Sequence, residues 1–231
     1  MLPLRSSIKA ERALITRTLC GFLALCACAS FLLELNHAML YRAFGFIPAR
    51  LTSPSAWQLL GPIHQLSSLF TYTFVHESWL HAGLNILFLW VFASPVETKL
   101  GGRSYVVFLT FIVLGCALCD TLARPASVIP LIGASGLVSG VMGIYIVTYP
   151  NSKLLILLPV AVPYPVKLGA RWFVLVWLSL QIATAFNKQF DTILVAWWIH
   201  LVGFFLGGLY GWRQLRSIGR TEAAAQRRGD L

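Results

Sequence analysis

The sequence predicts an all-α fold, a bundle of six helices that cross a membrane. Two observations support this prediction: the composition of the chain and the length of its apolar runs. Hydrophobic residues make up 58% of the 231 residues and charged residues only 11%, whereas an ordinary soluble domain has about 25% charged residues. At a mean hydropathy of +0.75, the chain has too few charges to cover a water-soluble globule. A soluble enzyme, a disordered tail and a secreted disulfide scaffold are therefore excluded.

Six apolar runs are long enough to span a bilayer, which takes about 20 residues per helix. The runs are continuous rather than alternating, so they favour helices over the strands of a membrane barrel. They divide the chain into an N-terminal segment (1–18), a six-helix domain (19–212) and a basic tail (213–231). The helices are expected at about residues 19–35, 79–96, 105–122, 129–148, 170–186 and 193–210.

Two connections differ from ordinary loops. Residues 36–78 form a long connection that is rich in Leu and Phe and contains Trp57 and Tyr72, so we expect this segment to lie in or on the bilayer. Residues 154–165 are apolar but too few to span it, and three prolines interrupt them. We expect an interfacial or re-entrant segment there.

The basic residues predict the orientation of the bundle. If the N-terminus is cytoplasmic, 14 of the 18 lysines and arginines fall on the cytoplasmic side, in agreement with the positive-inside rule. Both termini are therefore expected in the cytoplasm. The net charge of +10 then reflects topology, because the chain lacks the basic stripes with aromatic residues that indicate nucleic-acid binding.

The five cysteines all lie in or beside apolar runs. Cys116 and Cys119 form a C-x-x-C pair, but no strand–helix–strand pattern surrounds it. We expect plain buried thiols rather than a zinc site or a disulfide.

Polar side chains at membrane depth are costly and indicate functional sites. In the predicted topology the second, fourth and sixth helices run in the same direction, and each carries polar residues a few positions after its start. At about 1.5 Å per residue, these side chains lie in one layer, roughly 10 Å below the outer surface. They are His81, Asn85, Ser135 and His200.

Glycine spacing predicts a contact between two of these helices. Gly136 and Gly140 form a G-x-x-x-G pair on the fourth helix, as Gly203 and Gly207 do on the sixth, and such faces let helices approach closely. Ser135 on the fourth helix could then pass its proton to His200 on the sixth. Taken singly, a membrane serine usually bonds to its own backbone and a lone histidine usually packs between helices. Their coincidence in one layer favours catalysis.

A near match to a zinc-protease motif begins at His76. The segment from His76 to His81 is one residue longer than H-E-x-x-H. Zinc ligands in that motif share one helix face, whereas residues five apart diverge by roughly 140°. We therefore expect no metal and no other cofactor.

Around these residues the sequence resembles the rhomboid family of intramembrane serine proteases, over about residues 64–212. Three segments carry the resemblance in the family's order. They are FTYTFVHESWLHAGLNILFLWVFASPVE with its H-x-x-x-N pattern, GASGLVSGVMG with G-x-S-G, and VAWWIHLVGFFLGG with a histidine before G-x-x-x-G.

The resemblance implies a role for each matching polar residue. Ser135 is the implied nucleophile, and His200 is the implied general base of a serine–histidine dyad. His81, Asn85 and the backbone N–H of Ser135 form the implied oxyanion hole, whose donors stabilise the transition state.

Four further residues have implied supporting roles. Gly133 lets the backbone approach the substrate carbonyl, and Gly136 belongs to the nucleophile motif. His76 is expected to be structural. Glu97 is expected to cap or pair at the cytoplasmic end of the second helix.

Two departures from the family pattern affect packing rather than the dyad. The position one turn after the nucleophile is often aromatic and packs on the catalytic histidine, but here it is Ser139. Many members carry a Trp-Arg pair in the first loop, where this chain has only Trp57-Gln58 at a different spacing.

The resemblance implies a serine endopeptidase that cleaves transmembrane segments of other membrane proteins. We expect a bacterial inner membrane, a site open to the outer side, and a gate formed by Trp172, Phe173, Trp177 and the loop before the sixth helix. One alternative is an inactive rhomboid-like protein that binds membrane clients, which the presence of both Ser135 and His200 disfavours. Another is a small-solute transporter, which the apolar inner halves of the three helices disfavour.

Overall fold

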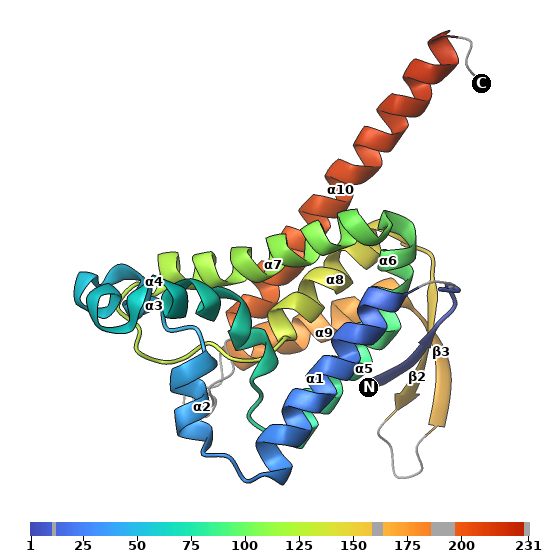
Figure 1. Cartoon of the computed structure of the whole chain (residues 1–231). Coiled ribbons are helices and arrows are strands. Elements are labelled where there is room, and N and C mark those ends of the chain that lie inside the picture. The colour runs from blue at the N-terminus through green and yellow to red at the C-terminus, as the bar shows by residue number, and fades with distance from the viewer. Residues whose placement is uncertain (11–12, 159–163, 186–196, 229–231) are drawn as a thin grey trace.

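The computed structural model describes residues 1–10, 13–158, 164–185 and 197–228 and is mostly helical (Figure 1). In chain order its elements are β1 (Leu2–Ser6), α1 (Leu14–Leu32), α2 (His37–Phe44), α3 (Pro48–Thr52), α4 (Pro54–Thr71), η1 (Tyr72–Phe74), α5 (Trp79–Phe88), η2 (Leu89–Ala93), α6 (Ser94–Leu100), α7 (Gly102–Ala123), α8 (Ser135–Thr148), β2 (Lys153–Leu158), β3 (Tyr164–Gly169), α9 (Ala170–Ala185) and α10 (Trp197–Arg228).

Within the described residues, three helices are long and apolar enough to cross a membrane. They are Leu14–Leu32, Gly102–Ala123 and the continuous helix Trp79–Leu100, which joins α5, η2 and α6. Ser135–Thr148 and Ala170–Thr184 are shorter apolar helices. The expectation of a helical membrane protein is thus confirmed, whereas the count of six crossings and the cytoplasmic position of both termini stay predictions.

Some helix ends differ from those that the sequence predicts. α8 begins at Ser135 rather than near residue 129, because the chain before it is extended: Phe46 and Leu131 exchange backbone hydrogen bonds of 3.0 and 2.7 Å. α10 continues to Arg228 through most of the expected tail. That stretch is rich in Ala, Arg and Gln, which are strong helix formers.

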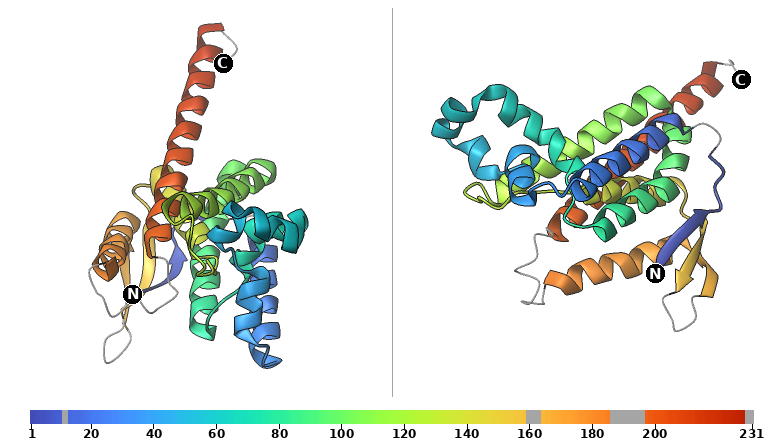
Figure 2. Two further views of the ribbon diagram at one scale, coloured as in Figure 1. Left: turned by 90° about the vertical axis from the view of Figure 1, so that its left-hand side faces the viewer. Right: turned by 60° about the horizontal axis from the view of Figure 1, so that its bottom comes forward.

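The all-α prediction is wrong at one edge of the molecule, where β1, β2 and β3 form a three-stranded antiparallel sheet in that order. Figure 2 shows the sheet beside α9 at the edge of the bundle. β2 occupies part of the stretch expected to be interfacial or re-entrant, and its buried residues alternate, with Leu154 and Ile156 facing inward. Such alternation is typical of a strand with one buried face.

α8 is the central helix, because every residue from Gly136 to Tyr145 is buried. α10 packs along it in parallel. A Cβ atom on Gly203 would meet the carbonyl of Gly136, and one on Gly207 would meet that of Gly140. The predicted contact between the two glycine faces is therefore confirmed.

α5 and its continuation also run parallel to α8. Near its start, His81 lies beside Gly133, the residue two before α8. Further along, the rings of Phe92 and Tyr145 are 5.1 Å apart and perpendicular. The three helices that carry the predicted polar layer thus run in the same direction, as the sequence predicts.

Glu97 caps a helix, as expected, but the helix is α1 rather than its own. Its two carboxylate oxygens accept the backbone N–H groups of Ile15 and Thr16 at 2.9 and 2.7 Å. These N–H groups lie in the first turn, where no intrahelical acceptor exists. Glu97 therefore fixes the start of α1 against the end of the helix Trp79–Leu100.

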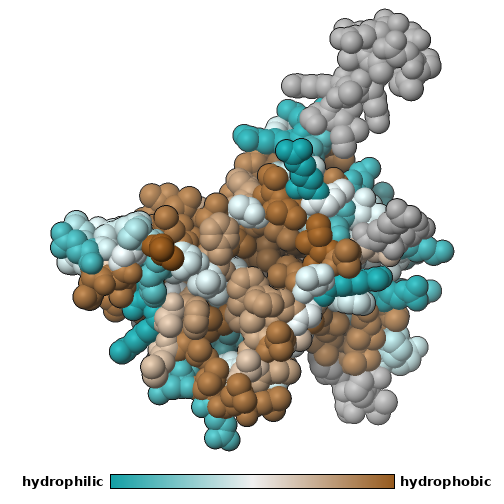
Figure 3. All heavy atoms as spheres, in the orientation of Figure 1, coloured by the Kyte–Doolittle hydropathy of each residue, from teal (hydrophilic) through white to brown (hydrophobic). Residues whose placement is uncertain are grey.

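The long connection 36–78 folds into α2, α3, α4 and η1 and docks on the segment that precedes α8. Besides the Phe46–Leu131 pair, Ala49 N–H donates to the Ser127 carbonyl at 3.0 Å. Apolar side chains also cover much of the face of the molecule that Figure 3 shows. The location of this connection in or on the bilayer stays a prediction.

Candidate active site

Ser135 is the first residue of α8. It follows Gly133, whose φ of +95° suits glycine and turns the extended chain into the helix. The first N–H groups of a helix have no intrahelical partner, so the backbone around Ser135 presents free donors. Its hydroxyl oxygen lies 2.8 Å from Nε2 of His200.

His200 lies near the start of α10 and is 8% exposed. The close approach of α8 and α10 along their glycines brings its ring to Ser135. The Ser139 hydroxyl, where an aromatic ring was expected from the family pattern, instead donates to the Ser135 carbonyl at 2.6 Å. The aromatic contact comes from α9, where the Trp177 ring lies 5.9 Å from that of His200.

Gln181 on α9 is a site residue that the sequence analysis missed. Its Oε1 lies 2.5 Å from Nδ1 of His200. An amide oxygen only accepts hydrogen bonds, so Nδ1 carries the proton and Nε2 is free to accept from the Ser135 hydroxyl. The signal for it in the sequence is a polar amide within the apolar run 170–186.

His81 and Asn85 flank the backbone just before Ser135. A Cβ atom on Gly133 would lie 2.8 Å from Cε1 of His81 and 3.9 Å from Nδ2 of Asn85. Asn85 is only 5% exposed, and its Nδ2 has no hydrogen-bond partner within the described part of the chain. A buried donor without a partner is costly, so this amide is available to an oxyanion at the serine.

His76 packs against His81, on the chain just before α5. It is buried, and its ring packs edge-on against that of His81 with 5.1 Å between centroids. Two effects lower the pKa of His76 to about 4: burial, which is the larger, and the neighbouring His81. The ring is therefore neutral near pH 7. Among the residues that the structure describes, no three His, Cys, Asp or Glu side chains could hold a metal ion.

The residues expected to form a gate do not behave alike. Phe173 is buried and packs on Phe88 and Phe92, each 5.9 Å away, so it anchors the start of α9. Trp172 is exposed, and Trp177 lies against His200. The loop before α10, also expected in the gate, falls largely outside the described residues.

The five cysteines are free thiols, as expected, but only Cys20 and Cys116 are buried, whereas the other three are partly exposed. Cys116 is buried on α7 near Gly136, whereas Cys119 is only half-buried. Cys116 therefore contributes to packing between α7 and α8.

Comparison with known proteins gives two findings that agree with this geometry. The chain is 30% identical over 167 residues to Rhomboid protein 1, mitochondrial, of Saccharomyces cerevisiae (strain ATCC 204508 / S288c), and the match covers 67% of this chain and 43% of that protein. The chain thus matches less than half the length of this relative. The family model described as Rhomboid domain matches residues 63–217. The chain therefore belongs to the rhomboid family, a family of membrane proteins that are generally serine proteases.

Proposed function

We propose that the chain is an intramembrane serine endopeptidase that cleaves transmembrane segments of other membrane proteins. The observation that supports it best is the 2.8 Å separation of the Ser135 hydroxyl oxygen and Nε2 of His200, between two tightly packed helices of a rhomboid chain. A nucleophile within hydrogen-bond reach of a base is the arrangement that acyl transfer needs.

The proposed reaction has two stages. His200 takes the hydroxyl proton of Ser135 at Nε2 while the serine oxygen attacks the peptide carbonyl. The protonated ring then gives this proton to the leaving amine as the carbon–nitrogen bond breaks, which leaves an acyl-enzyme. Water, deprotonated by the same ring, hydrolyses the ester and restores the serine.

The oxyanion of each tetrahedral intermediate is proposed to lie among Asn85, His81 and the backbone N–H of Ser135. Preorganised donors in a water-poor site stabilise a developing negative charge strongly. Gly133 leaves room for the substrate carbonyl, because any side chain there would collide with His81. Gly136 serves the site indirectly, since a Cβ atom there would lie 2.9 Å from Cγ2 of Ile199, the residue before His200 on α10.

Gln181 is proposed as a positioning residue that holds His200 in the reactive tautomer. The hydrogen bond on one ring nitrogen determines which nitrogen carries the proton. Trp177 would restrict the ring from a second side. Both residues belong to α9, so the position of this helix relative to α10 would control the reactivity of the dyad.

The orientation in the membrane is part of the proposal. From the distribution of basic residues, we infer that both termini are cytoplasmic and that the site opens to the opposite side of the membrane. A bacterial inner membrane is the location expected from the resemblance and stays a proposal, and the relative with 30% identity is a mitochondrial protein. Expression with a reporter fused to the C-terminus in bacteria tests the orientation.

Labelling with a serine-directed fluorophosphonate tests the proposed chemistry. We expect the full-length protein in detergent to be labelled and Ser135→Ala and His200→Ala to be unlabelled. Ser139→Ala is the matched control, because this serine lies one turn further along α8 and points its hydroxyl at the backbone. An unlabelled wild-type protein that still binds membrane clients would favour the inactive rhomboid-like alternative.

A further inference from the structure

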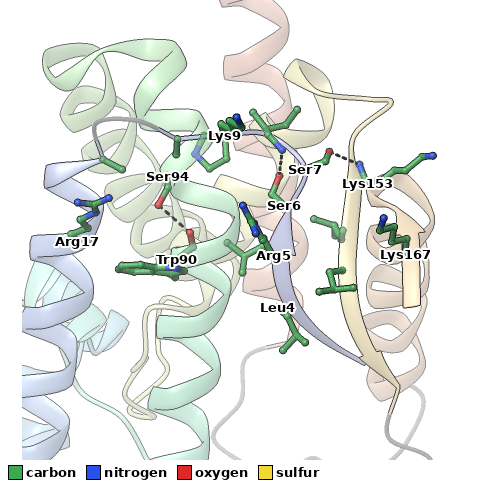
Figure 4. Close-up of a pocket in the computed structure, with 17 residues that line it drawn as sticks. Leu4, Arg5, Ser6, Ser7, Lys9, Arg17, Trp90, Ser94, Lys153 and Lys167 are labelled. Carbon is green, nitrogen blue, oxygen red and sulfur yellow. Dashed lines mark hydrogen bonds between the residues drawn. The ribbon is translucent and has the colours of Figure 1, made fainter. Parts of the chain in front are cut away.

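A cavity of about 680 Å³ lies between the sheet and the start of α1 (Figure 4). Its walls come from β1 and the chain after it, the start of α1, the η2 region, β2 and β3. Its lining residue Ser6 shares a hydrogen bond of 2.7 Å with the Tyr145 hydroxyl of α8, and Ser135 lies ten residues before Tyr145, or about 15 Å along this helix. The cavity is therefore separate from the proposed active site.

The described lining of this cavity is strongly basic. It includes five cationic side chains and no Asp or Glu, and the ion pair found within the described chain, Asp120–Arg124, lies elsewhere. Residues 11 and 12, one acidic and one basic, fall outside the described part. Like charges gathered in one cavity repel, so the site favours an anion. The five cations are Arg5, Lys9, Arg17, Lys153 and Lys167.

The sheet fixes the positions of several of these cations. Arg5 pairs with Leu155, which in turn pairs with Lys167, and residues paired across strands share a face of the sheet. Ser7 ties the end of β1 to β2: its N–H donates to the Lys153 carbonyl at 2.8 Å, and its hydroxyl accepts from the Lys153 N–H at 3.0 Å. The basic cluster is thus held by backbone pairing.

The surroundings of the cavity favour a lipid over a free anion. It lies beside the start of α1 and the helix Trp79–Leu100, both long enough to cross a membrane. Trp90 and Leu4 are 51% and 41% exposed at its wall. Arg5 and Arg17 lie on either side of Trp90 (Figure 4). Cations beside an exposed aromatic ring are suited to a charged headgroup at the membrane surface.

We propose that this cavity binds the phosphodiester headgroup of an anionic phospholipid, whose acyl chains pass over Leu4 and Trp90. The arginines contact the phosphate oxygens, with which guanidinium groups form paired hydrogen bonds. The lysines add charge from the sheet and the preceding segment.

Calorimetry on the full-length protein in an uncharged detergent tests this proposal. The ligands are dihexanoylphosphatidylglycerol, dihexanoylphosphatidylcholine and inorganic phosphate. We expect the anionic lipid to bind at least about tenfold more tightly than the zwitterionic lipid. The double variant Arg5→Gln/Arg17→Gln should weaken anionic-lipid binding roughly thirtyfold, since each basic residue near the surface contributes about fivefold.

The control is Lys99→Gln/Arg103→Gln, which removes the same charge from two exposed residues outside the cavity lining. It should change binding by no more than about threefold. Equal losses in both double variants, or equal affinity for the two lipids, would overturn the proposal. Binding of inorganic phosphate as tight as that of the anionic lipid would also overturn it. If Arg5→Gln/Arg17→Gln fails to fold by circular dichroism, Lys9→Gln/Lys167→Gln replaces it with the same expected loss.

Discussion

Oε1 of Gln181 lies 2.5 Å from Nδ1 of His200, on the side of the ring that faces away from Ser135. The histidine is thus held between two helices, α9 through the glutamine and α8 through the serine. A carboxylate in this place would bring a charge to membrane depth, which is expensive. A neutral amide supplies the same acceptor without that cost.

Replacing Gln181 with Leu should lower kcat by about ten- to a hundredfold with little change in KM, because the ring loses the acceptor that fixes its tautomer. Cleavage of a fluorogenic transmembrane peptide in liposomes measures both constants. Gln181→Glu should restore part of the rate and move the acidic limb of the kcat/KM profile to higher pH, since the carboxylate favours the protonated ring. A purely structural role predicts neither the restored rate nor the shifted profile.

The dyad makes a sharper prediction. Ser135→Ala and His200→Ala should each lower kcat for the same peptide by roughly 10⁴-fold or more, because nucleophile and base act as one unit. The double variant should be scarcely worse than either single one. Turnover that survives in Ser135→Ala while the protein keeps its helical circular dichroism would refute the assignment, and Ser139→Ala again serves as the control.

Asn85 separates oxyanion stabilisation from substrate binding. Asn85→Leu removes the buried donor but keeps the volume, so kcat should fall about 10²- to 10³-fold while KM stays within a few fold. The amide would contact the substrate oxygen fully only in the tetrahedral state. A rise in KM at constant kcat would mean that Asn85 binds the ground state instead.

The sequence predicts the helical membrane fold and the shared direction of the three helices that carry His81, Ser135 and His200, because apolar length and charge position are properties of the chain alone. The sheet is different. β1 lies at the N-terminus and pairs with β2 after α8, and no local pattern indicates such a distant partner.

Gln181 was missed for a related reason. A single polar residue in an apolar helix does not show whether its side chain faces the lipid or another helix. The contact of Gln181 with His200 depends on how α9 packs against α10. The start of α8 was placed too early because residues 129–134 are largely apolar, yet they pair with the first long connection instead of forming a helix turn.

The contact between α8 and α10 allows a test of the fold that is independent of activity. A Cβ on Gly207 would overlap the backbone of Gly140, whereas one on the adjacent Gly208 has its nearest neighbours at 3.9 Å. Gly207→Ala should therefore destabilise the protein by about 1–3 kcal/mol, and Gly208→Ala should stay within about 0.5 kcal/mol of the wild type. Thermal unfolding in detergent, followed by circular dichroism, measures the difference. Because the same contact places His200 against Ser135, Gly207→Ala should also slow fluorophosphonate labelling, and equal melting temperatures for the two variants would show that the helices do not pack at these glycines.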